Sequence, residues 1–209
     1  MPRLLHIDSS PLGKASISRE LSAEFVANWK RTHPDGTIIR RDLAATSIPV
    51  VSAEWIAASF TPEASRTPAQ RDELSISDTL IAELEAADEC AIGIPMHNFT
   101  VAAPARLWID QIVRAGRTFA FVEGSAAGLL KNKKATFLIA SGGIYKLGSP
   151  MASFDFVEPY LRAIFGLMGV TDVHFLTAGG VAAIRFGKID RTTFLQPHIA
   201  AIREQFASV

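Results

Sequence analysis

Short apolar runs of strand length recur along the chain and predict five β-strands. They occupy residues 4–7, 37–43, 90–94, 135–140 and 172–176. Most of these runs are apolar at consecutive positions, which indicates strands covered on both faces, as in a parallel sheet. Pro95 is expected to end the third strand, and the turn at residues 141–143 is expected to end the fourth.

Apolar residues three or four positions apart predict helices between and after these strands. The repeated order of strand and helix predicts an α/β fold, in which a doubly wound, five-stranded parallel sheet carries helices on both faces. We expect residues 1–209 to form one domain. The helical sets are Ile17, Leu21, Phe25 and Trp29; Leu74, Ile81 and Leu84; Val101, Ala105, Trp108, Ile109, Ile112 and Val113; Val157, Leu161, Ile164 and Met168; and Ile199, Ile202 and Phe206.

Two connections, residues 44–67 and 117–133, are too long for this minimal pattern. Long loops in a compact domain usually have a function. We expect their aromatic side chains to be exposed and to form a lid or a contact between subunits. The aromatic residues are Trp55 and Phe60 in the first connection and Phe119 and Phe121 in the second, beside the apolar Ile56, Leu129 and Leu130.

The charge balance argues against nucleic-acid binding. Lys and Arg together number 21, Asp and Glu together number 21, and the formal net charge is zero. No basic excess is therefore available to hold a phosphate backbone. Basic residues cluster only at positions 40–41 and 131–134, which we interpret as solvated charges.

A single cysteine, Cys90, excludes an intrachain disulfide and a cysteine-based metal site. Its apolar neighbours predict a buried thiol without a chemical role, and the histidines show no metal-ligand spacing. The first residues lack a signal-peptide pattern, and no run approaches the roughly 18 apolar residues of a membrane span. We therefore expect a cytoplasmic protein without a metal site.

The segment after the first strand, residues 8–18, has the composition of an anion site. It holds Ser9, Ser10, Ser16 and Ser18 and opens the first helix, where free backbone N–H groups and the helix dipole favour negative charge. Simple helix capping is the alternative interpretation of these serines. The dinucleotide fingerprint and the P-loop motif are both absent here, and the glycines at 180–187 have the wrong spacing.

The segments after the third and fourth strands offer complementary chemistry. Asn98 provides a donor and an acceptor for a heterocycle edge, and Met96 and Phe99 provide soft or flat apolar contacts. Gly142 and Gly143 allow backbone N–H groups to approach a ligand closely. Each segment alone is also consistent with a plain turn. Together, at one edge of a parallel sheet, they suit a mononucleotide with a flat ring, such as FMN.

The sequence resembles the FMN-dependent NADH azoreductases, also known as FMN-dependent NADH:quinone oxidoreductases. The resemblance implies a flavodoxin-like fold, a homodimer with one FMN per subunit, and NADH as the electron donor. It extends over nearly the whole chain. The shared motifs are the serines at 9–10 and 16–18, the segments at 95–99, 108–110 and 114–119, and the segment at 142–145.

The same resemblance implies roles for individual residues. The flavin lies near the dimer interface, where Phe121 of one subunit reaches over the flavin of the other and lines the substrate pocket with Tyr145. His97 stands where relatives often carry tyrosine, which affects the expected substrate choice more than flavin binding. The residues implied in cofactor binding are Ser10, Ser16, Ile17 and Ser18 at the phosphate, Met96, His97, Asn98 and Phe99 at the isoalloxazine, and Ser141, Gly142 and Gly143 at its pyrimidine side.

The implied reaction is a two-electron, ping-pong hydride transfer from NADH to quinones or to aromatic azo compounds. The N–H groups of Gly142 and Gly143 are expected to stabilise negative charge on the reduced flavin, as donors do in an oxyanion hole. No side chain need act as a nucleophile, and His97 or Tyr145 is a candidate contact to the acceptor. We expect Asp8 to cap the first loop and to have no catalytic role.

The main alternative is a flavodoxin-like electron carrier without a small-molecule substrate of its own. Such carriers are usually strongly acidic, because negative charge steers them towards redox partners. The neutral balance of this chain and its two long connections favour an enzyme. A signalling receiver domain is a poorer fit, because no acidic phospho-acceptor ends the third strand. A two-electron reductase that uses FAD or prefers NADPH remains a further alternative.

Overall fold

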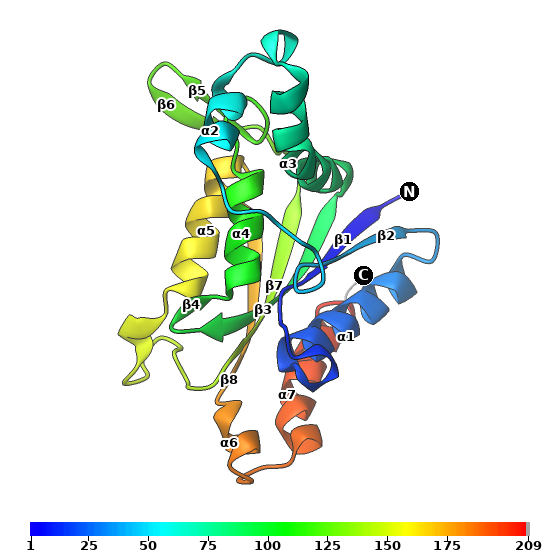
Figure 1. The fold of residues 1–209 in the computed structure, drawn as a ribbon. Coiled ribbons are helices and arrows are strands. Elements are labelled where there is room, and N and C mark those ends of the chain that lie inside the picture. Colours follow the sequence, from blue (N-terminus) through cyan, green and yellow to red (C-terminus); the bar gives the residue numbers. More distant parts are fainter. Residues whose placement is uncertain (208–209) are drawn as a thin grey trace.

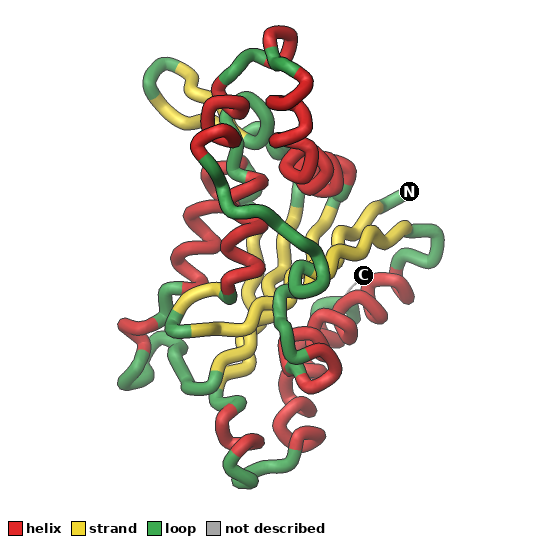
Figure 2. Tube along the Cα trace, in the orientation of Figure 1, coloured by secondary structure: helices red, strands yellow, loops and turns green. Residues whose placement is uncertain are grey.

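The computed structural model describes residues 1–207 and contains a parallel sheet with helices on both faces (Figure 1). The strands follow the order β2-β1-β3-β7-β8, which confirms the predicted doubly wound α/β fold. Figure 2 shows the strands in the middle of the molecule and the helices around them. The five strands are β1 (Arg3–Asp8), β2 (Thr37–Asp42), β3 (Glu89–His97), β7 (Lys134–Ser141) and β8 (Asp172–Gly179).

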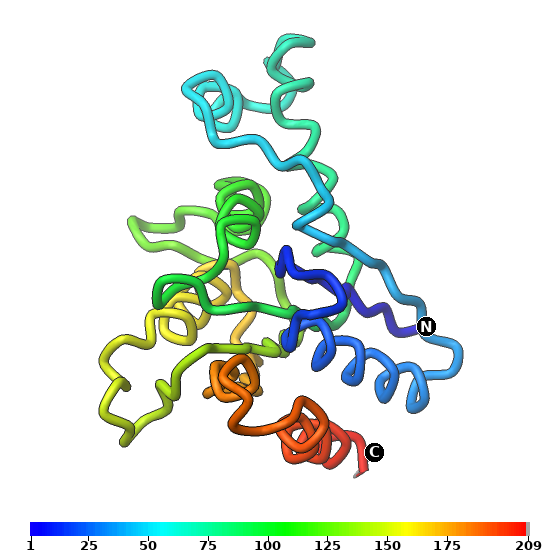
Figure 3. The backbone as a smooth tube through the Cα atoms, turned by 60° about the horizontal axis from the view of Figure 1, so that its bottom comes forward, coloured from blue at the N-terminus to red at the C-terminus, as the bar shows by residue number. Residues whose placement is uncertain are grey.

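The helices divide into two groups that cover opposite faces of the sheet. On one face α1 (Ile17–Thr32) and α7 (Arg191–Glu204) pack side by side, as Figure 3 shows in blue and red. On the other face lie α3 (Pro68–Ala86), α4 (Ala103–Ile112) and α5 (Val157–Met168). Most residues of the apolar sets expected from the spacing are buried, and the largest buried side chains include Trp29 and Trp108.

The third strand is longer than predicted, because Pro95 does not end it. Strand β3 pairs with β1 only as far as Gly93, while its pairing with β7 continues to Pro95 opposite Ala140. Pro95 therefore has a neighbouring strand on one side only, an edge-like setting in which a missing N–H is tolerated. The strand continues to His97 and thereby carries part of the predicted loop as regular structure.

A tight hairpin follows β3 and replaces the predicted start of the next helix. Asn98 and Phe99 form its turn with φ angles of 48° and 69°, both in the left-handed region. The returning strand β4 (Thr100–Val101) pairs antiparallel with β3, with His97 opposite Thr100. Val101 was expected in the helix, but it lies in β4, because the two-residue turn returns the chain before α4 begins.

Both long connections contain structure of their own. Residues 44–67 include α2 (Ala53–Phe60), and residues 117–133 include the hairpin of β5 (Phe119–Val122) and β6 (Ser125–Gly128). The expectation of exposed aromatics is confirmed for Phe60 and Phe121, which are 73% and 70% exposed. It is wrong for Phe119, which is half-buried, and for Trp55, which packs in a buried cluster with Ala58 and Leu74 and donates its indole N–H to Gln111 Oε1 (2.8 Å).

The remaining elements are short. Helix α6 (Ala182–Arg185) lies between β8 and α7. Single 3₁₀ turns occupy Gly13–Ala15, Glu63–Ser65 and Ala152–Phe154. In the described part of the chain, no helix combines the length and the apolar character needed to span a membrane.

A close backbone approach holds the β5–β6 hairpin against the end of α5. The position of a Cβ on Gly128 lies 2.1 Å from the backbone nitrogen of Gly169, and Gly169 itself has a φ of 97°. The N–H of Leu130 donates to the carbonyl of Met168 (2.9 Å) beside this contact. Only glycine at position 128 allows the two backbones to meet in this way.

We expect Gly128→Ala to lower the free energy of unfolding by about 2 kcal/mol or more, because the added methyl overlaps backbone atoms of α5 and no flexible side chain can move aside. Urea unfolding followed by circular dichroism measures the change. Ser125→Ala, an exposed position in the same hairpin, is the control and should stay within about 0.5 kcal/mol of the parent. Equal stabilities of the two variants would contradict the backbone contact.

Cys90 is buried in β3, as predicted, and this burial raises the pKa of its thiol from 9.0 to about 12. The thiol is therefore neutral in the folded protein through the physiological range, and the thiolate is the reactive form. We expect Ellman's reagent at about pH 8 to leave Cys90 unmodified until urea unfolds the chain. Rapid labelling of the native protein would contradict this burial.

Candidate functional site

The start of α1 supplies hydroxyl groups and free backbone donors. Ser16 caps the helix by accepting the N–H of Arg19 (3.3 Å), and its Oγ lies 3.1 Å from Oγ of Ser18. Within residues 1–207, the N–H groups of Ile17 and Ser18 have no acceptor. The capping interpretation therefore holds for Ser16, and two donors at the positive end of the helix dipole remain for an anion.

Two other polar residues of this segment have structural contacts. The hydroxyl of Ser9 donates to the carbonyl of Gly93 (2.8 Å), which ties the end of β1 to β3. Asp8 was expected to cap the loop, but its Oδ1 accepts the hydroxyl of Ser22 (2.7 Å) and so holds α1 against the sheet. The Ser9 hydroxyl and the Asp8 carboxylate therefore make hydrogen bonds that stabilise the fold.

The β3–β4 turn presents the second set of residues. Met96 is half-buried and His97 is exposed, and Asn98 and Phe99 form the turn itself. The ring of Phe99 lies 6.0 Å from that of Tyr145 and 5.1 Å from that of Phe154, measured between centroids. These contacts fix the turn against the segment that follows β7.

The segment after β7 presents free backbone donors. The carbonyl of Ser141 accepts the N–H of Val181 (3.0 Å), and the carbonyl of Gly142 accepts the N–H of Ala182 (3.2 Å). The Ser141 hydroxyl donates to the carbonyl of Gly143 (2.9 Å). Among residues 1–207, nothing accepts the N–H groups of Gly142 and Gly143. A Cβ built on Gly142 meets open space, so this position borders an empty volume.

The three segments meet around one cavity of about 160 Å³ at the carboxyl edge of the sheet. This is the edge at which ligands bind in open α/β sheets. The cavity thus brings together seven of the residues expected at a cofactor and five further ones. The expected residues are Ser10, Ser16, Ile17, Met96, His97, Ser141 and Gly142, and the further ones are Leu12, Ala15, Pro95, Ala140 and Val181.

Some expected residues lie beside this cavity or away from it. Four expected residues lie within two positions of a lining residue without lining the cavity themselves: Ser18, Asn98, Phe99 and Gly143. Tyr145 lines a separate cavity of about 390 Å³ at the start of α5. The strand β5, which carries Phe121, lies at the opposite end of the molecule from the carboxyl edge of the sheet (Figure 1).

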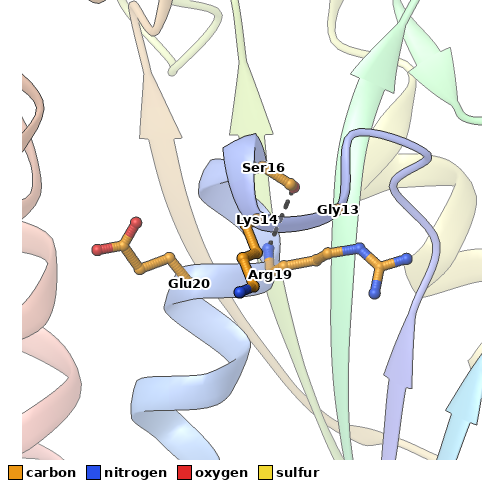
Figure 4. Close-up of a pocket in the computed structure, with 5 residues that line it drawn as sticks. All are labelled: Gly13, Lys14, Ser16, Arg19 and Glu20. Carbon is orange, nitrogen blue, oxygen red and sulfur yellow. Dashed lines mark hydrogen bonds between the residues drawn. The ribbon is translucent and has the colours of Figure 1, made fainter.

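A larger cavity of about 420 Å³ lies on the flank of α1 and shares Ser16 with the first (Figure 4). Its other lining residues are Gly13, Lys14, Arg19 and Glu20. The carboxylate of Glu20 is paired with Arg191 (2.5 Å), and no segment from β3 or β7 reaches this cavity. Of these two cavities the smaller one unites the three segments, and it is therefore the candidate site.

The sequence pattern gave no warning of Val181. We expected contacts after the first, third and fourth strands, whereas Val181 follows β8. The glycines at 179–180 end that strand and could have indicated a fourth turn at the same edge. The N–H groups of Gly180, Val181 and Ala182 donate to carbonyls of residues 141–143, so this fourth turn holds the glycine pair in place.

Histidine, cysteine and carboxylate side chains form no cluster able to hold a metal ion anywhere in the described residues. The site consists of hydroxyls, backbone N–H groups and apolar surface. Such a set can bind an anion and a flat ring, but it provides no activated nucleophile.

Comparison with known proteins identifies the family of the chain. A family model described as "Flavodoxin-like fold" matches residues 2–206. An FMN-dependent NADH:quinone oxidoreductase from Acidobacterium capsulatum is 50% identical over 207 residues, which cover 99% of this chain and 100% of that protein. FMN-dependent NADH:quinone oxidoreductase 3 from Burkholderia lata is 47% identical over 207 residues, with the same coverage of both chains.

Solved structures show the same fold at lower identity. An azoreductase from Bacillus anthracis superposes with a TM-score of 0.88 at 23% identity and covers 100% of both chains. An FMN-dependent NADH-azoreductase from the same species, in complex with FMN, gives a TM-score of 0.87 at 23% identity, with 100% of this chain and 99% of that chain covered. The chain belongs to the flavodoxin-like family that includes the FMN-dependent NADH:quinone oxidoreductases.

Proposed function

We propose that this protein is an FMN-dependent oxidoreductase that uses NADH to reduce quinones and to cleave the azo bond of aromatic azo compounds. The observation that carries the proposal is the single cavity in which the start of α1, the end of β3 and the glycine pair after β7 meet. Relatives that match over their full length and bear the NADH:quinone activity in their names support the quinone reduction, and the azoreductases of the same fold support the azo cleavage.

The groups around the cavity fit the parts of FMN. The free N–H groups of Ile17 and Ser18, with the hydroxyls of Ser10 and Ser16, suit a phosphate at a helix N-terminus. Met96 and the β3–β4 turn supply apolar and amide surface for a flat ring. After β7, Gly142 leaves room for that ring because it has no side chain.

Bound FMN supplies the hydride chemistry, and the chain supplies position and electrostatics. The N–H groups of Gly142 and Gly143, free within the described residues, are donors for negative charge on a ligand. They need no reorganisation, because the carbonyls of the same two peptide planes, those of Ser141 and Gly142, already accept hydrogen bonds. Exposed His97 lines the cavity mouth and is a candidate contact to the electron acceptor, as is Tyr145. The donor and the acceptor bind in turn at the same open face.

We also propose that residues 1–209 act as one FMN-binding domain within a cytoplasmic homodimer. Phe121 is exposed on β5, and β5 lies at the far end of its own subunit from the site cavity (Figure 1). Phe121 therefore reaches the site of a second copy and not its own. In that arrangement Phe121 covers the substrate side of the partner's site. The exposed Phe60 and Ile56 of α2 provide further apolar surface for such a contact.

Turnover is the direct test of the function. We expect the purified protein to bind FMN and NADH to bleach the bound flavin, with reoxidation by a quinone and by an azo dye. Absorbance at the flavin band and NADH consumption measure the two half-reactions. A protein that binds FMN but turns over neither acceptor would be an electron carrier, and one that ignores FMN would have another function altogether.

Gly142→Val tests the assignment of the cavity. The new side chain enters space that is empty in the free chain, so the fold should persist while the FMN dissociation constant rises about tenfold or more. Quenching of flavin fluorescence by the apo-protein measures the binding. Gly166→Val is the matched control, because a Cβ there also meets open space but on α5. Equal FMN affinity in both variants would remove Gly142 from the site.

A further inference from the structure

An ionic cluster lies beneath the first segment of the site. Arg19, in the first turns of α1, donates through Nη2 to Oδ1 of Asp42 (2.6 Å) and through Nη1 to Oδ2 of the same residue (2.8 Å). Asp8 lies 3.6 Å from Nη1 on the other side. Asp8 and Asp42 stand opposite each other at the ends of β1 and β2, so the guanidinium bridges two strand ends.

The same guanidinium also holds the backbone of the loop. Both Nε and Nη2 of Arg19 donate to the carbonyl of Ser10, at 2.8 and 2.7 Å. Ser10 lines the cavity and is almost fully buried, and its Oγ accepts the N–H of Leu12 (3.4 Å). Because two donors bind one carbonyl, the peptide plane between Ser10 and Pro11 is held in place, and the Leu12 N–H orients the Ser10 hydroxyl.

The backbone of Arg19 secures the other end of the loop. Its N–H donates to Oγ of Ser16, the helix cap that also lines the cavity. Arg19 therefore contacts both Ser10 and Ser16, the two serines of this loop that line the cavity. Its own side chain does not line the cavity and lies on the flank of α1, where Figure 4 shows it extending away from Glu20.

The ion pair between Arg19 and Asp42 keeps both side chains in their charged forms. The hydrogen bond from Arg19 lowers the pKa of Asp42, and the same bond raises the pKa of Arg19. Both groups therefore stay ionised near neutral pH. The planar fork of an arginine can bind a carboxylate and a carbonyl together, which the point charge of a lysine does less well.

We propose that Arg19 is a positioning residue that holds the loop of residues 9–16 in the shape that receives the phosphate of FMN. The inference rests on the proposed function and adds to it a residue that does not touch the ligand. Phosphate binding then depends on Arg19, while binding of the flavin ring, which uses the β3–β4 turn and the glycine pair, is independent of it.

Comparison of FMN with riboflavin, which lacks the phosphate, isolates this role. Apo-protein is titrated with each flavin, and quenching of flavin fluorescence gives both dissociation constants. We expect Arg19→Gln to raise the constant for FMN about tenfold and to leave that for riboflavin within about twofold. Arg19→Lys should restore part of the FMN affinity, with a rise of about threefold.

Two further variants complete the experiment. Asp42→Asn weakens the ion pair that holds Arg19, and it should raise the dissociation constant for FMN about threefold without changing that for riboflavin. This variant tests the proposal even if Arg19→Gln does not fold. Arg31→Gln, in the last turn of the same helix, is the control and should change neither constant. Equal losses for FMN and riboflavin, or no loss, would overturn the role of Arg19. A parent protein that binds neither flavin would instead overturn the proposed function.

Discussion

Parallel pairing of β1, β3 and β7 is the constraint on which the site depends. Each of these strands is buried on both faces, so the pairing is fixed by apolar packing of α1 and α7 on one side and of α3, α4 and α5 on the other. Because all three strands point the same way, the segments that follow them emerge at one edge. Residues more than 120 positions apart in the sequence, such as Ser16 and Gly142, thereby line one cavity.

Much of this arrangement could be predicted from the sequence. The apolar runs located all five strands of the sheet, and the positions of serines and glycines at strand ends indicated which segments would meet. What the pattern missed depends on contacts between distant residues. Trp55 is buried against Leu74 of α3, and Gln111, 56 residues away, accepts its N–H. Pro95 stays in a strand because β1 stops pairing earlier. The role of Val181 likewise depends on hydrogen bonds to the segment after β7.

Electrostatic contacts near the start of α1 show how a protein of zero net charge can suit the proposed phosphate of FMN. The carboxylates of Asp8 and Asp42 lie close to the start of α1, where they would repel a phosphate if they were left without partners. Arg19 neutralises part of this charge, and Ser22 donates to Asp8. The groups proposed to hold the phosphate are consequently uncharged hydroxyl and N–H groups, which bind an anion by direction more than by net charge.

The strained turn at Asn98 and Phe99 couples its own opening to that of the segment after β7. A phenylalanine at a φ of 69° is unfavourable by itself, and the conformation persists only because surrounding contacts compensate for it. These contacts come from Tyr145, Phe154 and the N–H of Phe156, which donates to the carbonyl of Phe99 (3.2 Å). Detachment of residues 144–156 would release the turn as well, so the two segments should open as one cooperative unit whose amide protons exchange with solvent together.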